Sequence, residues 1–260
     1  MELILPFGGN LSSIQNEVTK LALKPDGTER TISTSSAKIE SGHPIREWYM
    51  ATWAGVNPQT GDEEWYINGV DGATTTVFNY AERVYQGANA IPKITAVMNF
   101  HIDFKGFFLD ASAYYAGGHK VLEGWHRYTS EPNGYTFAFQ GLSTLLDRWQ
   151  KPGDIARHGK YTSAGAPWQR HTKYLYDGDF IRLRTAQLGY DFKDKFEHLG
   201  ITNLRVFFRG NNLFTWVKDK NLEFDPEVSL GDNLDDESDG QIGLQTPPSK
   251  SVSFGLTLNF

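Results

Sequence analysis

The side chains that could do chemistry in this sequence are carboxylates, arginines and aromatic rings. An acidic run near the C-terminus carries five carboxylates, those of Asp232, Asp235, Asp236, Glu237 and Asp239. Hard oxygen ligands at such close spacing could bind Ca²⁺, although the spacing is not that of an EF-hand loop. A solvated loop is the alternative interpretation, and we prefer it because charge runs are usually hydrated surface.

The histidines do not indicate a metal site by their spacing. All 7 are dispersed, no pair has the i, i+4 spacing of a helical zinc site, and there are no cysteines to supply thiolates or disulfides. A G-x-S-x-G elbow, a P-loop and an H-E-x-x-H motif are also missing from the sequence. Adjacent Glu63 and Glu64 would lie on opposite faces of a strand, so they do not form a glycosidase pair. We therefore expect no enzyme, and no cofactor apart from the calcium considered above.

Aromatic residues make up 14% of the chain and gather in positions 116–179. Trp125, Tyr128 and Trp168 lie there among histidines and arginines. Such rings stack on sugars and peptides and anchor interfaces, so these three are candidate contacts for a solute or a partner. Internal packing of a long loop is the alternative, and for any single residue it is the better interpretation.

Two pairs of arginines alternate within predicted strands. Arg182 and Arg184 share one face of their strand, and Arg205 and Arg209 share one face of theirs. An arginine facing lipid costs about 2–4 kcal/mol near the middle of a membrane. If the strands cross a membrane, Arg205 and Arg209 should face the lumen and contact a partner or an anionic solute. Phe207 and Leu213 would then be lumenal as well.

The elements that hold these side chains are predicted from alternation. In 251–260 the apolar residues Val252, Phe254, Leu256, Leu258 and Phe260 alternate with small polar ones. A strand of about ten residues with one apolar face is typical of a transmembrane β-barrel, and it also fits one strand of a soluble sandwich. Further strands are predicted at 14–23, 45–55, 94–103, 107–115, 180–190 and 204–216, with a tight turn at 105–106.

The predicted connections fall into two classes. Those at one rim, 24–42, 105–106 and 191–203, are shorter as a class than those at the other rim, 57–90, 116–179 and 217–250. Short periplasmic turns and long extracellular loops are typical of outer-membrane barrels. The sequence has no run of about 18 apolar residues that would make a membrane helix. A net charge of -6 argues against a nucleic-acid partner.

Several segments resemble one family. The segment 178–190, GDFIRLRTAQLGY, is similar to a strand segment of SusC/RagA-type TonB-dependent transporters. Segments 146–149, 199–216 and 224–227 resemble further family segments, in the family's order, and the chain ends in the expected phenylalanine. Any one of these motifs is weak evidence, whereas the ordered set is specific.

The resemblance implies an all-β fold, an antiparallel transmembrane β-barrel segment forming the C-terminal third of a barrel of about 22 strands. Positions 1–260 would be the C-terminal part of one barrel domain, without the plug domain, the TonB box or a signal peptide. The implied function is import of an oligosaccharide or peptide across the outer membrane of a Gram-negative, Bacteroidota-like bacterium. Partners would be the remaining barrel strands and plug, a SusD-like surface lipoprotein, the TonB–ExbB–ExbD system and outer-membrane lipid. A barrel that anchors a surface assembly without import, and a soluble carbohydrate-binding module, remain alternatives.

Overall fold

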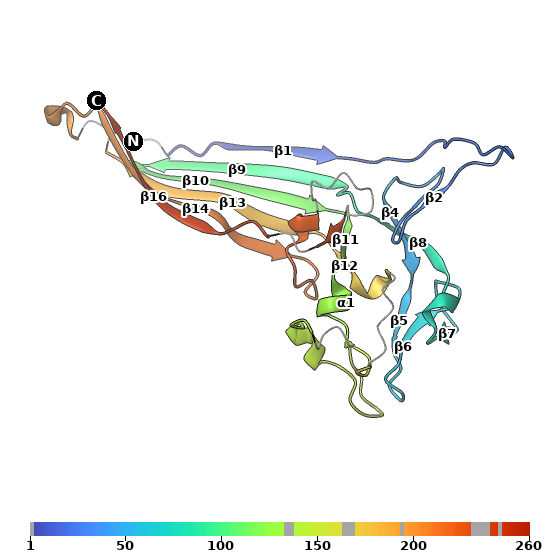
Figure 1. Cartoon of the computed structure of the whole chain (residues 1–260). Helices are drawn as coiled ribbons and strands as arrows, with labels where there is room; N and C mark the ends of the chain where they lie inside the picture. The colour runs from blue at the N-terminus through green and yellow to red at the C-terminus, as the bar shows by residue number, and fades with distance from the viewer. Residues whose placement is uncertain (1–2, 133–137, 163–169, 193–194, 230–239, 244–245) are drawn as a thin grey trace.

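The computed structural model describes the chain except for residues 1–2, 133–137, 163–169, 193–194, 230–239 and 244–245. Its largest element is a six-stranded sheet in which every neighbouring pair is antiparallel (Figure 1). In spatial order the strands are β1 (Phe7–Ser13), β9 (Ile94–Phe104), β10 (Phe107–Gly117), β13 (Phe180–Asp191), β14 (Asn203–Val217) and β16 (Ser251–Asn259). The all-β fold class is thus confirmed.

Five of the predicted strands are confirmed as β9, β10, β13, β14 and β16, and two predictions were wrong. Positions 14–23 form no strand, because their apolar residues do not keep period two, and β1 takes the place beside β9 instead. Positions 45–55 are extended but divide into β4 (Glu47–Ala51) and β5 (Trp53–Val56), and neither joins the large sheet.

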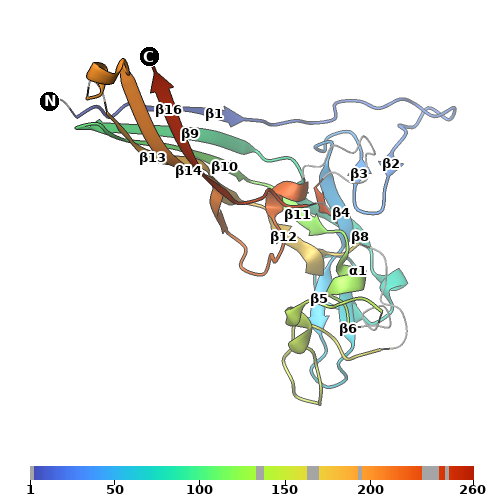
Figure 2. The ribbon, with the colours of Figure 1, turned by 60° about the vertical axis from the view of Figure 1, so that its left-hand side comes forward.

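The connections are segregated by length. The long ones, 14–93, 118–179 and 218–250, all leave one end of the sheet, whereas the turn at 105–106 and the connection 192–202 lie at the other end, near both termini (Figures 1 and 2). The predicted segregation is confirmed, but segment 24–42 was assigned to the wrong rim. Because β1 precedes that segment, 24–42 and 57–90 belong to the same long connection. We call the described parts of 14–93, 118–179 and 218–250 the loop layer.

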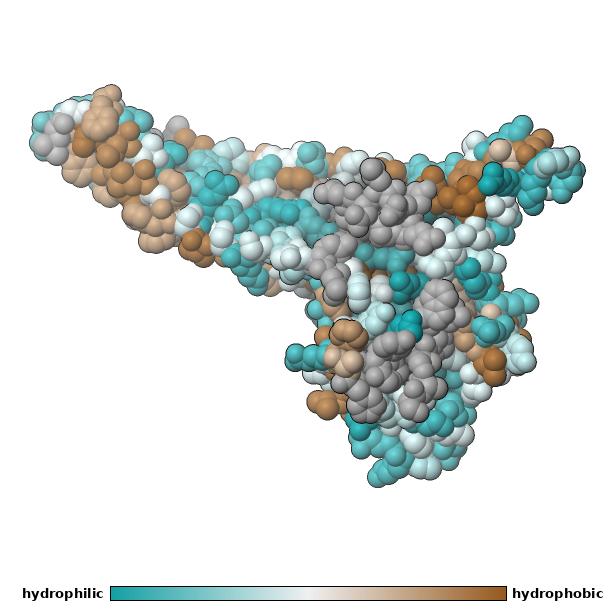
Figure 3. Space-filling view, in the orientation of Figure 1, coloured by the Kyte–Doolittle hydropathy of each residue, from teal (hydrophilic) through white to brown (hydrophobic). Residues whose placement is uncertain are grey.

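One face of the sheet is apolar and exposed, which inverts the usual burial of a soluble protein. Leu188 is 57% exposed and lies opposite Leu109 on β10 and Phe208 on β14, while Phe208 faces Phe254 on β16. The other face carries polar residues of the same strands at the alternate positions. In the view of Figure 3 the middle of the sheet is largely hydrophilic, and hydrophobic residues show at its end near the termini and along its lower margin.

The largest cluster of buried apolar residues lies in the loop layer. Four smaller sheets build this layer in the described part of the chain. They are β2 (Ile32–Ser33) with β3 (Lys38–Ile39), β4 with β8 (Arg83–Asn89), β5 with β6 (Glu63–Tyr66) and β7 (Thr74–Thr75), and β11 (Lys120–Glu123) with β12 (Leu175–Asp177) and β15 (Gln241–Ile242). The main core packs β4 against β11, β12 and β15, and it comprises Trp48, Met50, Ala90, Val121, Leu122, Tyr174, Leu175, Tyr176, Leu222 and Ile242.

Helical segments are short and lie between the strands. They are α1 (His126–Thr129) and the 3₁₀ turns η1 (Phe78–Tyr80), η3 (Ser143–Leu146), η4 (Thr172–Tyr174), η5 (Glu197–Leu199) and η6 (Pro226–Ser229). Among the residues that the structure describes, no helix is both long and apolar enough to cross a membrane.

Candidate functional site

A network of ion pairs fixes the connection after β14 to the polar face of β13. The buried guanidinium of Arg182 lies 2.5 Å from Asp225 Oδ1 and its Nε lies 2.9 Å from Glu227 Oε2. Arg184 also contacts Glu227, and its guanidinium lies 4.8 Å from the ring centre of Tyr114. An arginine this deeply buried needs carboxylate partners, because an unpaired buried charge is strongly destabilising. The sequence motifs of 178–190 and 224–227 are therefore physically coupled.

Arg205 and Arg209 lie on the polar face, as expected. Arg205 is opposite Asp191, with 3.0 Å between Nη2 and Oδ2, and its guanidinium lies 4.6 Å from the ring centre of Phe108. Arg209 lies opposite Gln187 in the register of β13 and β14. Contact of either arginine with a plug or a solute stays a prediction.

Phe207 shares that polar face, whereas the prediction for Leu213 was wrong. The ring of Phe207 covers Gly255 of β16, where a Cβ atom would collide with it. A bulge in β14 places Asn212 at φ 51° and interrupts the alternation between Asn211 and Phe214. Leu213 consequently lies over Gly210, on the apolar face of the sheet.

Two of the three predicted aromatic contacts lie in the described loop layer. Trp125, just before α1, and Tyr128 are half-buried, with ring centres 5.0 Å apart. Tyr128 also packs edge-on against Phe139 at 5.3 Å. Trp168 lies outside the described residues, as do the carboxylates of 232–239 that were considered for calcium. The contact role of these rings and the calcium site both stay predictions.

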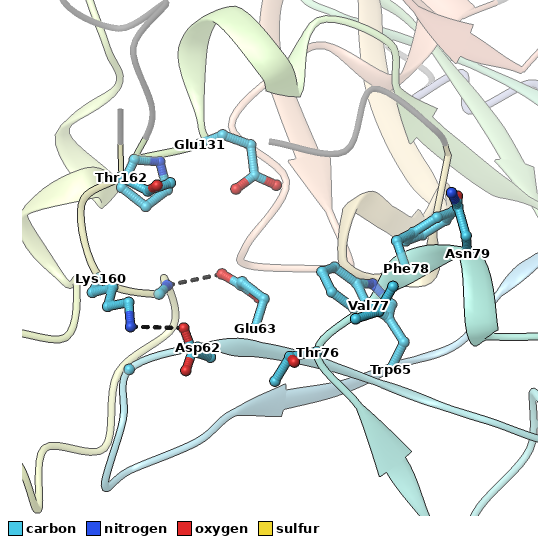
Figure 4. A pocket seen from close by; sticks show the side chains of 13 residues that line it. Asp62, Glu63, Trp65, Thr76, Val77, Phe78, Asn79, Glu131, Lys160 and Thr162 are labelled. Carbon is cyan, nitrogen blue, oxygen red and sulfur yellow. Dashed lines mark hydrogen bonds and ion pairs between the residues drawn. The ribbon is translucent and has the colours of Figure 1, made fainter. Parts of the chain in front are cut away.

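A cavity of about 440 Å³ opens in the loop layer. Figure 4 shows Trp65 and Glu63 of β6, Phe78 of η1, and Glu131 around it. Its rim includes an ion pair of 2.8 Å between Lys160 and Asp62. The cavity thus combines aromatic walls with several charged groups, as many ligand sites do.

Glu63 is the most heavily bonded carboxylate of the cavity. It accepts hydrogen bonds from the indole of Trp53 at 2.5 Å, the ammonium of Lys173 at 2.7 Å and the amide of Gly159 at 2.8 Å. Glu64 faces away and accepts from Asn57 and Thr74, so the two glutamates point to different sides as predicted. Because their carboxylates lie on different sides, Glu63 and Glu64 do not form a catalytic pair for glycoside hydrolysis.

Burial controls the titratable groups behind the cavity. It raises the pKa of Glu131 to about 7, against the opposing charge of Lys173. It also lowers the pKa of His126 to about 3 and that of His171 well below its usual value. Sequence spacing did not reveal this cluster, since His126 and Glu131 come from the segment around α1 and His171 from the start of η4.

The chain is similar in sequence to TonB-dependent receptors. No family model matches the chain. It is 30% identical over 165 residues to TonB-dependent receptor P26 of Formosa agariphila, covering 58% of this chain and 16% of that protein. TonB-dependent receptor P39 of the same organism is 25% identical over 177 residues, covering 66% and 16%.

The fold is similar to a particular transporter. A structure of the RagAB peptide transporter matches 99% of this chain and 27% of its own chain, with a TM-score of 0.80 and 25% identity. A structure of the RagAB peptide importer in its closed-closed state matches the same shares, with a TM-score of 0.78 and 25% identity. The resemblance to SusC/RagA-type TonB-dependent transporters is confirmed. The matched proteins are receptors and transporters and not enzymes.

Proposed function

We propose that this chain forms part of the wall and outer loops of a β-barrel that imports a nutrient across an outer membrane. The observation that carries the proposal is the exposed apolar face of the large sheet. Leu188, Phe208 and Phe254 stand side by side on three strands and are all more than half exposed. An apolar face that spans several strands would promote aggregation in water, whereas the hydrocarbon core of a membrane is a favourable environment for it.

Both edges of the sheet call for further strands. In the described part of the chain β1 pairs only with β9, and β16 only with β14. An open strand edge is not tolerated in lipid, because its backbone groups have no water to bond. The remaining barrel strands and a plug, from further sequence or a second chain, would complete the wall.

The loop layer supports a solute-binding role on the side opposite the short turns. Its cavity has aromatic walls, Trp65 and Phe78, and charged groups such as Asp62 and Lys160, a mixture that suits a peptide or an oligosaccharide. The similar RagAB structures are described as a peptide transporter and a peptide importer, which favours a peptide as the solute. By analogy, a SusD-like lipoprotein would cover the loop layer, and the TonB–ExbB–ExbD system would supply energy through a region outside this sequence. The host would be a Gram-negative, Bacteroidota-like bacterium, in line with the Formosa relatives.

The proposal is tested on cells that make the native protein. Membranes are solubilised in detergent, the protein is captured with an antibody to its C-terminal region, and its partners are identified by mass spectrometry. We expect a surface lipoprotein to co-purify, and deletion of the gene to abolish growth on either peptides or an oligosaccharide. Recovery of the protein in the aqueous fraction without detergent would refute the membrane role. Normal uptake after deletion, with the partner still bound, would favour an anchoring role without import.

A further inference from the structure

Two histidines and a glutamate meet in the interior of the loop layer. His126 and Glu131 flank the segment of α1, and His171 immediately precedes η4. All three side chains are buried, and one ligand atom from each lies within 4.8 Å of the other two. The distance from His171 Nε2 to Glu131 Oε1 is 3.9 Å. The fold therefore brings His171 to two metal-binding groups, His126 and Glu131, that lie close together in a distant part of the sequence.

His126 is oriented as a metal ligand would be. Its Nδ1 lies 2.9 Å from the carbonyl oxygen of Glu123 and donates to it, which leaves Nε2 as an acceptor. That Nε2 is buried and has no hydrogen-bond partner among the described residues. The ring of Tyr174 stacks on the imidazole at 4.4 Å, and its hydroxyl is held by the carbonyl oxygen of Ser130 at 3.0 Å. A backbone carbonyl that fixes one ring nitrogen is the usual support for metal binding by the other.

His171 is held from the other side and is also unsatisfied. Its ring lies edge-on to Trp65 at 5.7 Å and packs against Phe78 at 5.9 Å. Neither ring nitrogen has a hydrogen-bond partner among the described residues. Buried polar atoms without partners are rare because leaving one unpaired costs about 1–3 kcal/mol. A ligand for these nitrogens would remove that cost.

The charges around the cluster are of both signs, because Arg170 and Lys173 act on the histidines and Glu131 contributes a carboxylate. Glu131 Oε2 lies 3.6 Å from the ammonium of Lys173, but Lys173 lies closer to Glu63, at 2.7 Å. Two carboxylates thus share one ammonium group, and the two imidazoles are neutral. A divalent cation between His126, His171 and Glu131 would neutralise the carboxylate of Glu131, which lies farther from the Lys173 ammonium than Glu63 does.

We propose that His126 Nε2, His171 Nε2 and a carboxylate oxygen of Glu131 bind one Zn²⁺ ion. Two imidazoles and a carboxylate with a fourth position for water is an established zinc donor set. Ligand atoms of a tetrahedral zinc ion lie about 3.3 Å apart, so the present separations need only small side-chain rotations. Glu131, Trp65 and Phe78 also line the cavity of Figure 4, so the ion would adjoin the space open to a solute. It would link two segments of the loop layer, the one around α1 and the one at η4.

The test measures zinc directly and does not depend on transport. The native protein is purified in detergent, stripped with a chelator and dialysed against ZnCl₂, and bound zinc is measured by mass spectrometry and by calorimetry. We expect one zinc ion per chain and an X-ray absorption spectrum at the zinc edge that shows two imidazole ligands. His126→Ala, His171→Ala and Glu131→Gln should each weaken binding at least about 100-fold, beyond the loss of roughly 10–100-fold typical of supporting residues.

His119→Ala is the matched control. His119 is likewise buried with unpartnered ring nitrogens, but it packs at Gly178, away from the cluster. This variant should keep the wild-type zinc content. Limited proteolysis in zinc-free buffer checks that the variants fold, and zinc should slow cleavage of the loop layer in the wild type and in His119→Ala but not in the three ligand variants. An absence of bound zinc in the wild type, a spectrum without imidazole, or unchanged binding in both His126→Ala and His171→Ala would overturn the proposal.

Discussion

Leu188 offers the sharpest test of whether the apolar face of the sheet lies in lipid. Its side chain is 57% exposed, on a central strand between Leu109 and Phe208. Leu188→Arg would place a charge on that face without disturbing a buried core. Gln187→Lys is the matched control, because Gln187 is the next residue, faces the polar side, and lies opposite Asp110.

The expected cost follows from the depth of Leu188. The middle of the apolar face is marked by Ala186, opposite Ala111, which in turn faces Phe100. Leu188 is two residues from Ala186, about 6.6 Å along the strand and about 5 Å along the membrane normal at a tilt near 40°. The half-height of the apolar band is about 12 Å, so an arginine there should cost about 2–3 kcal/mol. That cost corresponds to a roughly 30–150-fold change in the folding equilibrium.

The assay is urea unfolding of the native protein in phosphatidylcholine vesicles, followed by tryptophan fluorescence. Leu188→Arg should lower the urea midpoint with an unchanged slope, and Gln187→Lys should leave the free energy of unfolding within about 0.5 kcal/mol of the wild type. If both variants unfold like the wild type, or if Leu188→Arg makes the protein soluble and stable without lipid, the membrane-facing role of this surface is wrong.

Three further changes test the loop layer and the sheet. Asp225→Ala should lower the free energy of unfolding by about 2 kcal/mol and speed hydrogen exchange in 218–229. The cost is below the ~3–5 kcal/mol for losing the sole partner of a buried charge, because Glu227 remains beside Arg182. Unchanged exchange would contradict the anchoring of this connection by Arg182. Burial lowers the pKa of His158 to about 3. Because the unfolded chain takes up a proton near pH 6.5 and the folded chain does not, the free energy of unfolding should fall by about 2 kcal/mol between pH 7 and pH 5. His158→Gln should remove that part of the pH dependence in urea titrations. Gly255→Val should cost about 1–3 kcal/mol by displacing the ring of Phe207, and Phe207→Ala in the same chain should recover most of it in the same vesicle assay.

Strong alternation made the central strands predictable. In β16 every second residue from Val252 to Leu258 is apolar, so its extent and its faces could be predicted from sequence. The edge strand β1 was missed because Gly8, Gly9 and Asn10 give it little alternation. Leu213 was misplaced since the bulge at Asn212 depends on a backbone conformation, φ 51°, that spacing alone does not reveal.

Contacts between distant segments were the least predictable part of the site. The arginine faces of β13 and β14 could be predicted from period two, but their carboxylate partners could not. Asp225 and Glu227 reach Arg182 only because the chain turns back after β14, although the resemblance at 224–227 marked that segment. His126 and His171 likewise meet through the packing of α1 against η4, a contact that no local pattern encodes.

The segregation of long connections at one end of the sheet affects how this protein can change over evolution. The free energy of closing a flexible loop grows slowly, by about 0.6 kcal/mol for each doubling of length. Insertions in 118–179 or 218–250 therefore cost the sheet little, provided that they spare the ion pairs of Arg182. Under the proposed function, a lineage could exchange one nutrient for another by remodelling these connections alone, while the hydrogen-bond register of every strand pair stays as it is.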